Sequence, residues 1–407
     1  MNKPNLNQLE KELSERFNHI DEISYFNHQK VIKAFQKVKV GTEHFQSTTG
    51  YGHDDLGRAK LDELYAEIFN TEAALARVNF VSGTHAIACA ILGNLKAHDE
   101  ILFAFGRPYD TLESMLTYIE NSLEGKVHIV EHNNWEDYEL VIEKTIALIN
   151  NKTKIIAIQR SRGYSASRPS VSVAQIGQLI QRVKSINPEI ICFVDNCYGE
   201  FVENYEPTEL EGDSKADLIA GSLIKNPGAG IVLAGGYVAG RSDLIENTAN
   251  RLTCPGVGAE GGPNFGQGLH LFQGIYLAPM IVSQIMKGMT LCAKVFDSLN
   301  MQSSPQWSDD RTDIIQRIDL GSRDKLIQFC KLLQGASPVD SHLTPYPAQT
   351  PGYEDELIMA AGTFVEGSTS ELSADGPLRE PYSAYLQGGL SYLYTKIFLE
   401  RFIQEHF

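Results

Sequence analysis

The feature that most constrains the fold of this chain is a series of seven short apolar runs that alternate with stretches of helical length. The runs are almost continuously apolar, which is typical of strands buried on both faces. Strands separated by helices predict a mainly parallel seven-stranded sheet covered on both sides, an α/β fold. The runs are ARVNFVSG (76–83), EILFAFG, VHIVEH, TKIIAIQRS, IICFVDN, DLIAGSLIK and GIVLAGGYVAG (230–240).

The length of the chain, 407 residues, favours two domains rather than one. Apolar residues at helical spacing in positions 6–20 predict an N-terminal helical segment over residues 1–40. A long apolar stretch follows the glycine-rich segment 254–266 and is interpreted as a helix that leaves the large domain. We therefore expect a large domain over residues 41–288 and a smaller α+β domain over residues 289–407.

Composition and charge exclude several classes of protein. The net charge of −16 argues against a nucleic-acid partner, because such binding depends on clustered Lys and Arg. The six cysteines form no CxxC pair and are expected to be buried free thiols in a reducing compartment. The N-terminus lacks the apolar core of a signal peptide, and no apolar run is expected to approach the ~20 residues of a membrane-spanning helix. We expect a cytoplasmic protein without a membrane partner.

Lys225 lies in the segment GSLIKNPGAG, directly after an apolar run and before several small residues. Ser82, Arg160 and Asp195 follow other runs in the same way, and an open α/β sheet binds its ligand outside the carboxyl ends of its strands. A buried lysine that stays charged and unpaired is costly, so its pKa should fall and make it a usable amine nucleophile. The alternative is a structural lysine that pairs with a carboxylate or caps carbonyl groups.

Asp195 and Tyr109 are candidates to contact a flat aromatic ligand. Asp195, in FVDNCYGE, ends an apolar run thirty positions before Lys225 and is placed to stabilise a protonated ring nitrogen. Its alternative role is the N-cap of a following helix. Tyr109, in FGRPYDTL, can lay its ring against such a ligand, with ordinary core packing as the alternative.

The segment FVSGTHAIACAIL predicts an anion site. It places Ser82, Gly83 and Thr84 between a strand and an alanine-rich helix, where free backbone amides suit a phosphate. Ser222, three residues before Lys225, can direct its hydroxyl to the same phosphate. Any tight strand-to-helix turn also favours Ser, Gly and Thr. The prediction of an anion site therefore rests on the position of the segment, between a strand and a helix.

Two arginine-containing segments are candidates to bind a substrate carboxylate, since arginine binds carboxylates through two parallel hydrogen bonds. QRSRGYSASRP contains Arg160, Arg162 and Arg168, and SADGPLREPY contains Arg379. Solvated surface charge is the alternative for these side chains. No metal site is predicted, because the neighbouring polar residues of the loop TTGYGHDD do not readily build a closed one.

SGTHA, Tyr109, DNCYGE and GSLIKNPGAG, in this order and spacing, resemble the fold-type I enzymes that use pyridoxal 5′-phosphate (PLP). More closely, the chain is similar to the methionine gamma-lyase-like or cystathionine beta-lyase-like family, often labelled aluminium resistance proteins. The similarity extends from about residue 25 to the C-terminus. Its most specific segments are TTGYGHDDLGR, QRSRGY, SLIKNPGAGI and ELSADGPLREPY.

The resemblance implies a role for each candidate residue. Lys225 would hold PLP covalently, and Asp195 would pair with its pyridine nitrogen. The phosphate and the ring would be bound by Ser82, Gly83, Thr84, Ser222 and Tyr109.

The resemblance also implies an active site shared between subunits of a homodimer or homotetramer. Tyr51 and Arg58 are the nearest counterparts of a tyrosine and an arginine that complete the neighbouring subunit's phosphate site. The intervening GHDDLG departs from that family pattern. Arg379 resembles the arginine that holds the substrate α-carboxylate, and Arg160 would be a second contact.

The implied function is a PLP-dependent carbon–sulfur lyase. Elimination from a sulfur-containing amino acid, of the cystathionine beta-lyase or methionine gamma-lyase type, would give a 2-oxo acid, ammonia and a thiol. An aminotransferase or β-synthase is the alternative, because PLP supplies the same electron sink to each reaction. A non-enzymatic alternative is a protein that binds PLP or a phosphorylated ligand and acts in metal tolerance.

Overall fold

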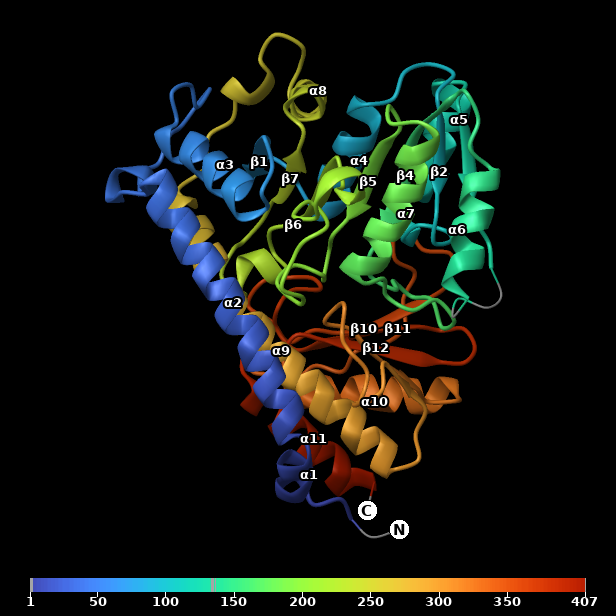
Figure 1. Cartoon of the computed structure of the whole chain (residues 1–407). Coiled ribbons are helices and arrows are strands. Elements are labelled where there is room, and N and C mark those ends of the chain that lie inside the picture. Colours follow the sequence, from blue (N-terminus) through green and yellow to red (C-terminus); the bar gives the residue numbers. More distant parts are fainter. Residues whose placement is uncertain (1–2, 133–134, 136, 407) are drawn as a thin grey trace.

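The chain folds into two sheet-containing parts that two long helices join along one side (Figure 1). The structure is a computed structural model, and it describes residues 3–132, 135 and 137–406. The long helices are α2 (Ser14–Val38) and α9 (Gly268–Ser298), which pack against each other.

The N-terminal segment is helical, with the short α1 (Leu6–Glu12) preceding α2. The side chain of Asn5 caps α1 by accepting a hydrogen bond from the backbone N–H of Gln8 at 3.3 Å. In α2, a stripe that includes Ile20 and Val31 is buried. The apolar spacing of the N-terminal segment therefore reflects packing within this chain.

The larger sheet has seven strands in the order β1-β7-β6-β5-β4-β2-β3. Six strands run in one direction and β7 runs against its neighbours β1 and β6, so the predicted mainly parallel seven-stranded sheet is confirmed. The first strand begins and ends earlier than the apolar run 76–83 suggested. It ends at Arg77 because residues 78–82 form the turn into the next helix. The strands are β1 (Ala73–Arg77), β2 (Glu100–Phe103), β3 (Lys126–Ile129), β4 (Thr153–Gln159), β5 (Ile191–Asp195), β6 (Leu218–Ser222) and β7 (Gly236–Gly240).

Both faces of this sheet are buried, as the continuous apolar runs predict. In β5, Phe193 belongs to a cluster that includes Ile87 of α4, whereas the next residue, Val194, belongs to the cluster on the opposite face with Leu179 of α7. Neighbouring residues of a strand point to opposite faces, so helices must cover both. The helices around this sheet are α3 (Leu56–Ile68), α4 (Gly83–Gly93), α5 (Glu113–Ser122), α6 (Tyr138–Ala147), α7 (Val173–Ile186) and α8 (Ser242–Leu252).

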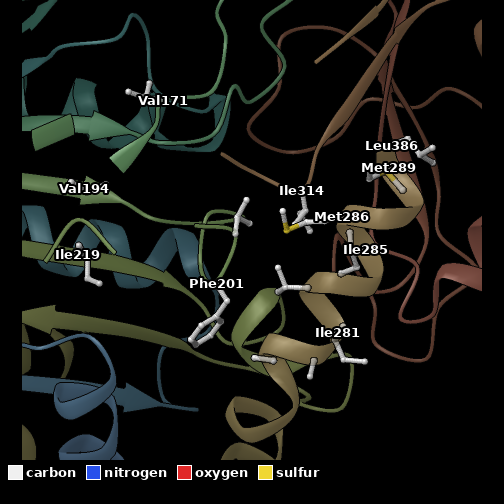
Figure 2. Packing of buried hydrophobic residues seen from close by; sticks show 14 of the residues in the cluster. Val171, Val194, Phe201, Ile219, Ile281, Ile285, Met286, Met289, Ile314 and Leu386 are labelled. Atoms are coloured by element: carbon white, nitrogen blue, oxygen red, sulfur yellow. The ribbon is translucent and has the colours of Figure 1, made fainter. Parts of the chain in front are cut away.

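Helix α9 connects the large sheet to a smaller C-terminal sheet. Figure 2 shows Ile281, Ile285 and Met289 of α9 in one hydrophobic cluster with Val194 of the large sheet and Leu386 of the small one. The sequence-predicted domain boundary at residue 288 lies inside this helix. The C-terminal elements are β8 (Ser303–Ser304), β9 (Gln316–Asp319), α10 (Arg323–Ala336), β10 (Leu357–Ala360), β11 (Ser373–Pro377), β12 (Ser383–Gln387) and α11 (Tyr392–His406).

Two expectations from composition need correction. Among the described residues, α9 is long and apolar enough to meet the length and composition of a membrane-spanning helix, contrary to the prediction that no run approaches this length. In the apolar window of α9, 61% is buried inside the protein, as in the core helix of a soluble protein. Five of the six cysteines are buried, but Cys254 is exposed.

Candidate active site

The carboxyl ends of three adjacent strands meet at one pocket. Gln159 of β4 pairs in register with Asp195 of β5, and Asp195 pairs with Ala220 of β6. Lys225 follows β6 by three residues. Gln159, Asp195 and Lys225 all line the pocket. The sheet therefore brings together Asp195 and Lys225, which the sequence singled out, and Gln159, which it did not.

The turn after β6 presents Lys225 to the pocket. It continues into a short 3-10 helix, η4 (Asn226–Gly228). A Cβ at Gly228 would lie 1.9 Å from the carbonyl oxygen of Leu223, so only glycine permits this turn. The Nζ of Lys225 lies 3.8 Å from the centroid of the Tyr198 ring, and the hydroxyl of Ser370 donates to the Lys225 carbonyl at 2.9 Å.

The pKa of Lys225 differs from the sequence prediction. Burial alone lowers the pKa, but Tyr198, Cys197 and Asp195 outweigh burial and raise it above its ordinary value. The prediction of a depressed pKa is therefore wrong for the protein without a ligand. Its premise was an unpaired ammonium, whereas this ammonium has an aromatic face and a carboxylate beside it.

Asp195 is 8% exposed at the end of β5. Burial raises the pKa of its carboxyl, and the nearby Lys225 acts in the opposite direction. Its Oδ1 accepts a hydrogen bond from the backbone N–H of Cys197 at 3.1 Å. The residues that follow form turns rather than a helix, so Asp195 is not a helix N-cap.

The start of α4 lies beside Ser222 at the end of β6. The side chain of Ser82 caps the helix by accepting from the backbone N–H of His85 at 3.2 Å. A Cβ at Gly83 would lie 2.7 Å from the Cβ of Ser222, so glycine is required for this approach. The hydroxyls of Thr84 and Thr111 are 3.1 Å apart. Backbone amides at a helix start and an adjacent serine hydroxyl suit a phosphate group.

Tyr109 contributes an aromatic wall to the pocket. Its backbone N–H donates to the side-chain oxygen of Gln159 at 2.8 Å, which ties the loop after β2 to the end of β4. Its ring lies edge-on to that of Tyr164, with the centroids 5.4 Å apart, and its hydroxyl contacts the hydroxyl of Tyr353. Tyr109 therefore faces the ligand space and also belongs to a cluster of tyrosines.

Sequence reasoning missed several pocket residues. Tyr198 lines the pocket and lies in the segment DNCYGE, three positions after Asp195. Its closeness to Asp195 in the sequence could have identified it as a site residue. Asp375 and Tyr385 also line the pocket, but they come from the C-terminal sheet. No local pattern indicates that this sheet packs over the end of β6.

Arg160 does not contact the pocket, contrary to its predicted role as a substrate ligand. Its side chain is fully buried and donates to Glu203 at 2.7 Å, Glu206 at 3.1 Å and Asn196 at 2.8 Å. These partners occupy both terminal nitrogens of a fully buried guanidinium, so it is not available to a substrate carboxylate. Arg160 stabilises the segment behind the pocket.

An Arg160→Met substitution is expected to lower the free energy of unfolding by about 3–5 kcal/mol, because it leaves the buried Glu206 and the partly buried Glu203 without their cation. Chemical denaturation measures this loss. Arg182→Met, at a surface ion pair with Glu139, is the matched control and should cost no more than about 1 kcal/mol. A higher KM with unchanged stability in Arg160→Met would instead restore the substrate-contact interpretation.

Arg162 and Arg168 are also buried rather than solvated. Arg162 donates to the backbone carbonyl of Ser304 at 2.9 Å, and Arg168 donates to that of Phe105 at 2.6 Å. Burial lowers the pKa of Arg168 to about 10. Both side chains bind backbone carbonyls near the pocket and position its loops.

Arg379 lies in an outer cleft beside the pocket. Tyr109 and Tyr164 line both spaces. The guanidinium donates to Asp355 at 2.9 Å and to the backbone carbonyl of Tyr164 at 3.1 Å. With 43% of its side chain exposed, Arg379 stays accessible to a substrate carboxylate.

The two residues assigned to a shared site differ in their surroundings. Tyr51 is 83% exposed and does not line the pocket of its own chain. Arg58 is buried and donates to the backbone carbonyls of Gly52, Gly262 and Glu260 at 2.6–2.9 Å. Arg58 therefore positions the loop that carries Tyr51, and its guanidinium is already occupied.

Behind Asp195, Glu200 is fully buried and accepts a hydrogen bond from the hydroxyl of Tyr237 at 2.9 Å. Burial, with Glu206 nearby, raises the pKa of Glu200 to about 8. Between its ordinary pKa and 8, the folded protein keeps a proton that the unfolded chain releases. The free energy of unfolding therefore falls as pH rises through this range.

A Glu200→Gln variant has no proton to release, so its stability should fall less with rising pH. Between pH 5.5 and pH 8.5 the wild type should lose about 2–4 kcal/mol more than the variant. Urea unfolding at the two pH values measures this difference, with Glu189→Gln on the surface as the control. Equal pH dependence in wild type and Glu200→Gln would contradict the buried, protonated carboxyl.

These residues fit PLP. The α4 start with Ser222 suits a phosphate, Asp195 offers an acceptor to a ring nitrogen, and Lys225 offers an amine to an aldehyde. Within the described part of the chain, no cluster of three or more His, Cys, Asp or Glu side chains has the arrangement of a metal site. The fold and the pocket together define the class of the protein, a fold type I enzyme of the PLP-dependent kind.

The chain belongs to the methionine gamma-lyase family, whose model matches residues 2–407. The predicted family and the prediction of a lyase are thereby confirmed. Several solved structures are similar over nearly the whole chain. One, from Listeria monocytogenes, is described as a candidate cystathionine beta-lyase involved in aluminum resistance; it is 44% identical, with a TM-score of 0.91 and 98% of each chain covered.

A second, from Clostridium novyi, is described as a carbon–sulfur lyase involved in aluminum resistance. It is 42% identical, with a TM-score of 0.88, and the match covers 98% of this chain and 94% of that one. A PLP-dependent protein of Escherichia coli, YhfS, is 14% identical, with a TM-score of 0.59 over 95% of this chain and 97% of its own. At that identity the likeness shows the fold alone, and the fold is that of PLP-dependent enzymes.

Proposed function

We propose that this protein is a PLP-dependent carbon–sulfur lyase that acts on a sulfur-containing amino acid and releases a 2-oxo acid, ammonia and a thiol. One observation carries the proposal: Lys225 and Asp195 line one pocket together with Thr84 of the α4 start, and the neighbouring Gly83 packs against Ser222. The family and the descriptions of the similar structures support a carbon–sulfur bond as the bond that breaks.

Lys225, Asp195 and the residues at the start of α4 each have a role in this reaction. The amides at the start of α4 and the hydroxyl of Ser222 hold the phosphate, and Asp195 orients the ring through its nitrogen. Bound PLP supplies an electron sink for the substrate carbon. Lys225 would hold the cofactor covalently, and its Nζ would take the proton from the substrate Cα.

Tyr109 and Arg379 act on the substrate side of the pocket. Tyr109 lines the pocket and would hold the flat cofactor ring and limit the access of water to it. Arg379 holds the α-carboxylate of the substrate, for which it exchanges its present partner Asp355. The half-exposed position of this ion pair makes the exchange inexpensive compared with breaking a buried pair.

A product assay tests the proposed reaction. Purified protein with PLP should convert L-cystathionine, L-methionine or an S-alkyl-L-cysteine into a 2-oxo acid, ammonia and a thiol in equal amounts. L-Cystathionine separates β from γ elimination by the oxo acid formed, because loss of sulfur from Cβ gives pyruvate and loss of sulfur from Cγ gives 2-oxobutyrate. Transfer of the amino group to an added 2-oxo acid, with no ammonia released, would identify an aminotransferase instead.

We further propose a cytoplasmic homodimer or homotetramer in which Tyr51 of one subunit completes the site of another. Its exposed position supports this assignment. Tyr51→Ala and Lys225→Ala should each be inactive, whereas co-expressed subunits should recover about a quarter of wild-type activity, because half of the dimers are mixed and hold one intact site. Lack of recovery in a mixture shown by mass spectrometry to contain mixed dimers would contradict the shared site.

A further inference from the structure

Asp375 of β11 is a buried acid in the pocket to which the proposed chemistry gives no role. Its side chain is 4% exposed and lines the same pocket as Lys225. Its Oδ2 accepts hydrogen bonds from the hydroxyls of Tyr164 at 2.8 Å and Ser368 at 2.9 Å. Its Oδ1 is buried and has no hydrogen-bond partner among the described residues.

An unpaired oxygen on a buried carboxylate is costly, and almost all such atoms in folded proteins have a partner. Burial raises the pKa of Asp375, while the hydrogen bonds from Tyr164 and Ser368 and the charge of Lys225 act against this rise. The two hydroxyls are neutral, so the positive charge that acts on Asp375 comes from Lys225, and the Oδ1 still lacks a hydrogen-bond donor. A molecule in the pocket that brings an N–H donor would satisfy the free oxygen.

The position of Asp375 indicates which end of a substrate it meets. An α-carboxylate has no donor and would be repelled, whereas the α-amine must reach Lys225 for the proposed reaction. Asp375 is bonded to Tyr164, which lines both the pocket and the outer cleft. The remaining part of the substrate, the far end of its side chain, is thus the part that Asp375 can contact.

We propose that Asp375 is a specificity-determining residue that accepts a hydrogen bond from an ammonium group at the far end of the substrate side chain. The preferred substrates are then thioether amino acids that carry a second amino group, rather than those that end in a methyl group. A methyl end would leave the Oδ1 of Asp375 buried without a donor. This inference rests on the proposed function, since it takes the pocket as an amino-acid site.

The test is calorimetric titration of the full-length protein, loaded with PLP, with L-ornithine and L-norleucine. Their side chains have the same number of heavy atoms, but one ends in ammonium and the other in methyl, and neither contains sulfur to eliminate. Wild type should bind L-ornithine at least about 10-fold more tightly, as expected for a hydrogen bond to a charged group. Asp375→Asn, which keeps the shape, should abolish this preference and leave L-norleucine binding within about twofold of wild type.

Several outcomes would overturn the inference. Equal affinity of wild type for the two ligands would do so without any variant, and so would an equal loss for both ligands in Asp375→Asn. An unchanged preference in the variant would show that another group recognises the ammonium. Because binding is measured without turnover, failure to release 2-oxo acid from any sulfur amino acid would refute the proposed reaction and leave this result intact.

Discussion

Replacement of Lys225 by alanine should abolish both covalent attachment of the cofactor and lyase activity. The Nζ of Lys225 is the amine that the turn after β6 presents to the pocket. Its loss removes the covalent anchor and the base together, and a positioned base alone contributes about 10²–10⁴-fold. We therefore expect turnover to fall by at least about 100-fold.

Absorption spectra and intact-protein mass spectrometry after borohydride reduction measure the attachment. Wild type should gain the mass of one reduced cofactor per chain and lose its visible band, whereas Lys225→Ala should do neither. Lys33→Ala, at an exposed lysine of α2, is the matched control and should behave as wild type. A colourless wild type that stays so in the presence of PLP would refute the cofactor assignment.

Asp195→Asn should give the second largest effect, a fall in turnover of about 10²–10³-fold with the cofactor still attached. The substitution keeps the acceptor for the backbone N–H of Cys197, so the turn after β5 should persist. It removes the negative charge that stabilises a protonated ring nitrogen, and the electron sink is weakened. Steady-state kinetics per mole of bound cofactor measures the effect.

The matched control for Asp195→Asn is Asp213→Asn, at an exposed aspartate between β5 and β6. Equal thermal unfolding temperatures would show that the two variants keep the fold. Wild-type turnover in Asp195→Asn at full cofactor occupancy would show that the carboxylate has only the structural role of holding the turn after β5.

The candidate site was predictable where its residues belong to a strand and the turn that follows. Lys225, Asp195 and Ser82 each come directly after an apolar run, and parallel strands bring their carboxyl ends to one edge. Arg160 follows the same rule but faces away from the pocket. The sequence places a residue at a strand end, whereas its local backbone and the partners contributed by other segments decide which side it faces.

The pKa of Lys225 likewise depends on contacts that the sequence alone does not reveal. Sequence reasoning accounted for burial, which lowers the pKa, but it had no means of locating the Tyr198 ring and the Asp195 carboxylate beside the ammonium. Coulombic interaction depends on distance, and those distances are set by the packing of β5 against β6.

The sequence by itself determined the α/β class, the mainly parallel sheet, the N-terminal helices and the family, because apolar periodicity and short glycine-containing motifs are local properties of the chain. Only the tertiary structure decided that Asp375 and Tyr385 line the pocket and that Arg160 lies outside it, bonded to Glu203. The physical reason is that α9 packs the C-terminal sheet against the large one through a shared hydrophobic cluster. Contacts between segments so far apart in sequence have no local signature.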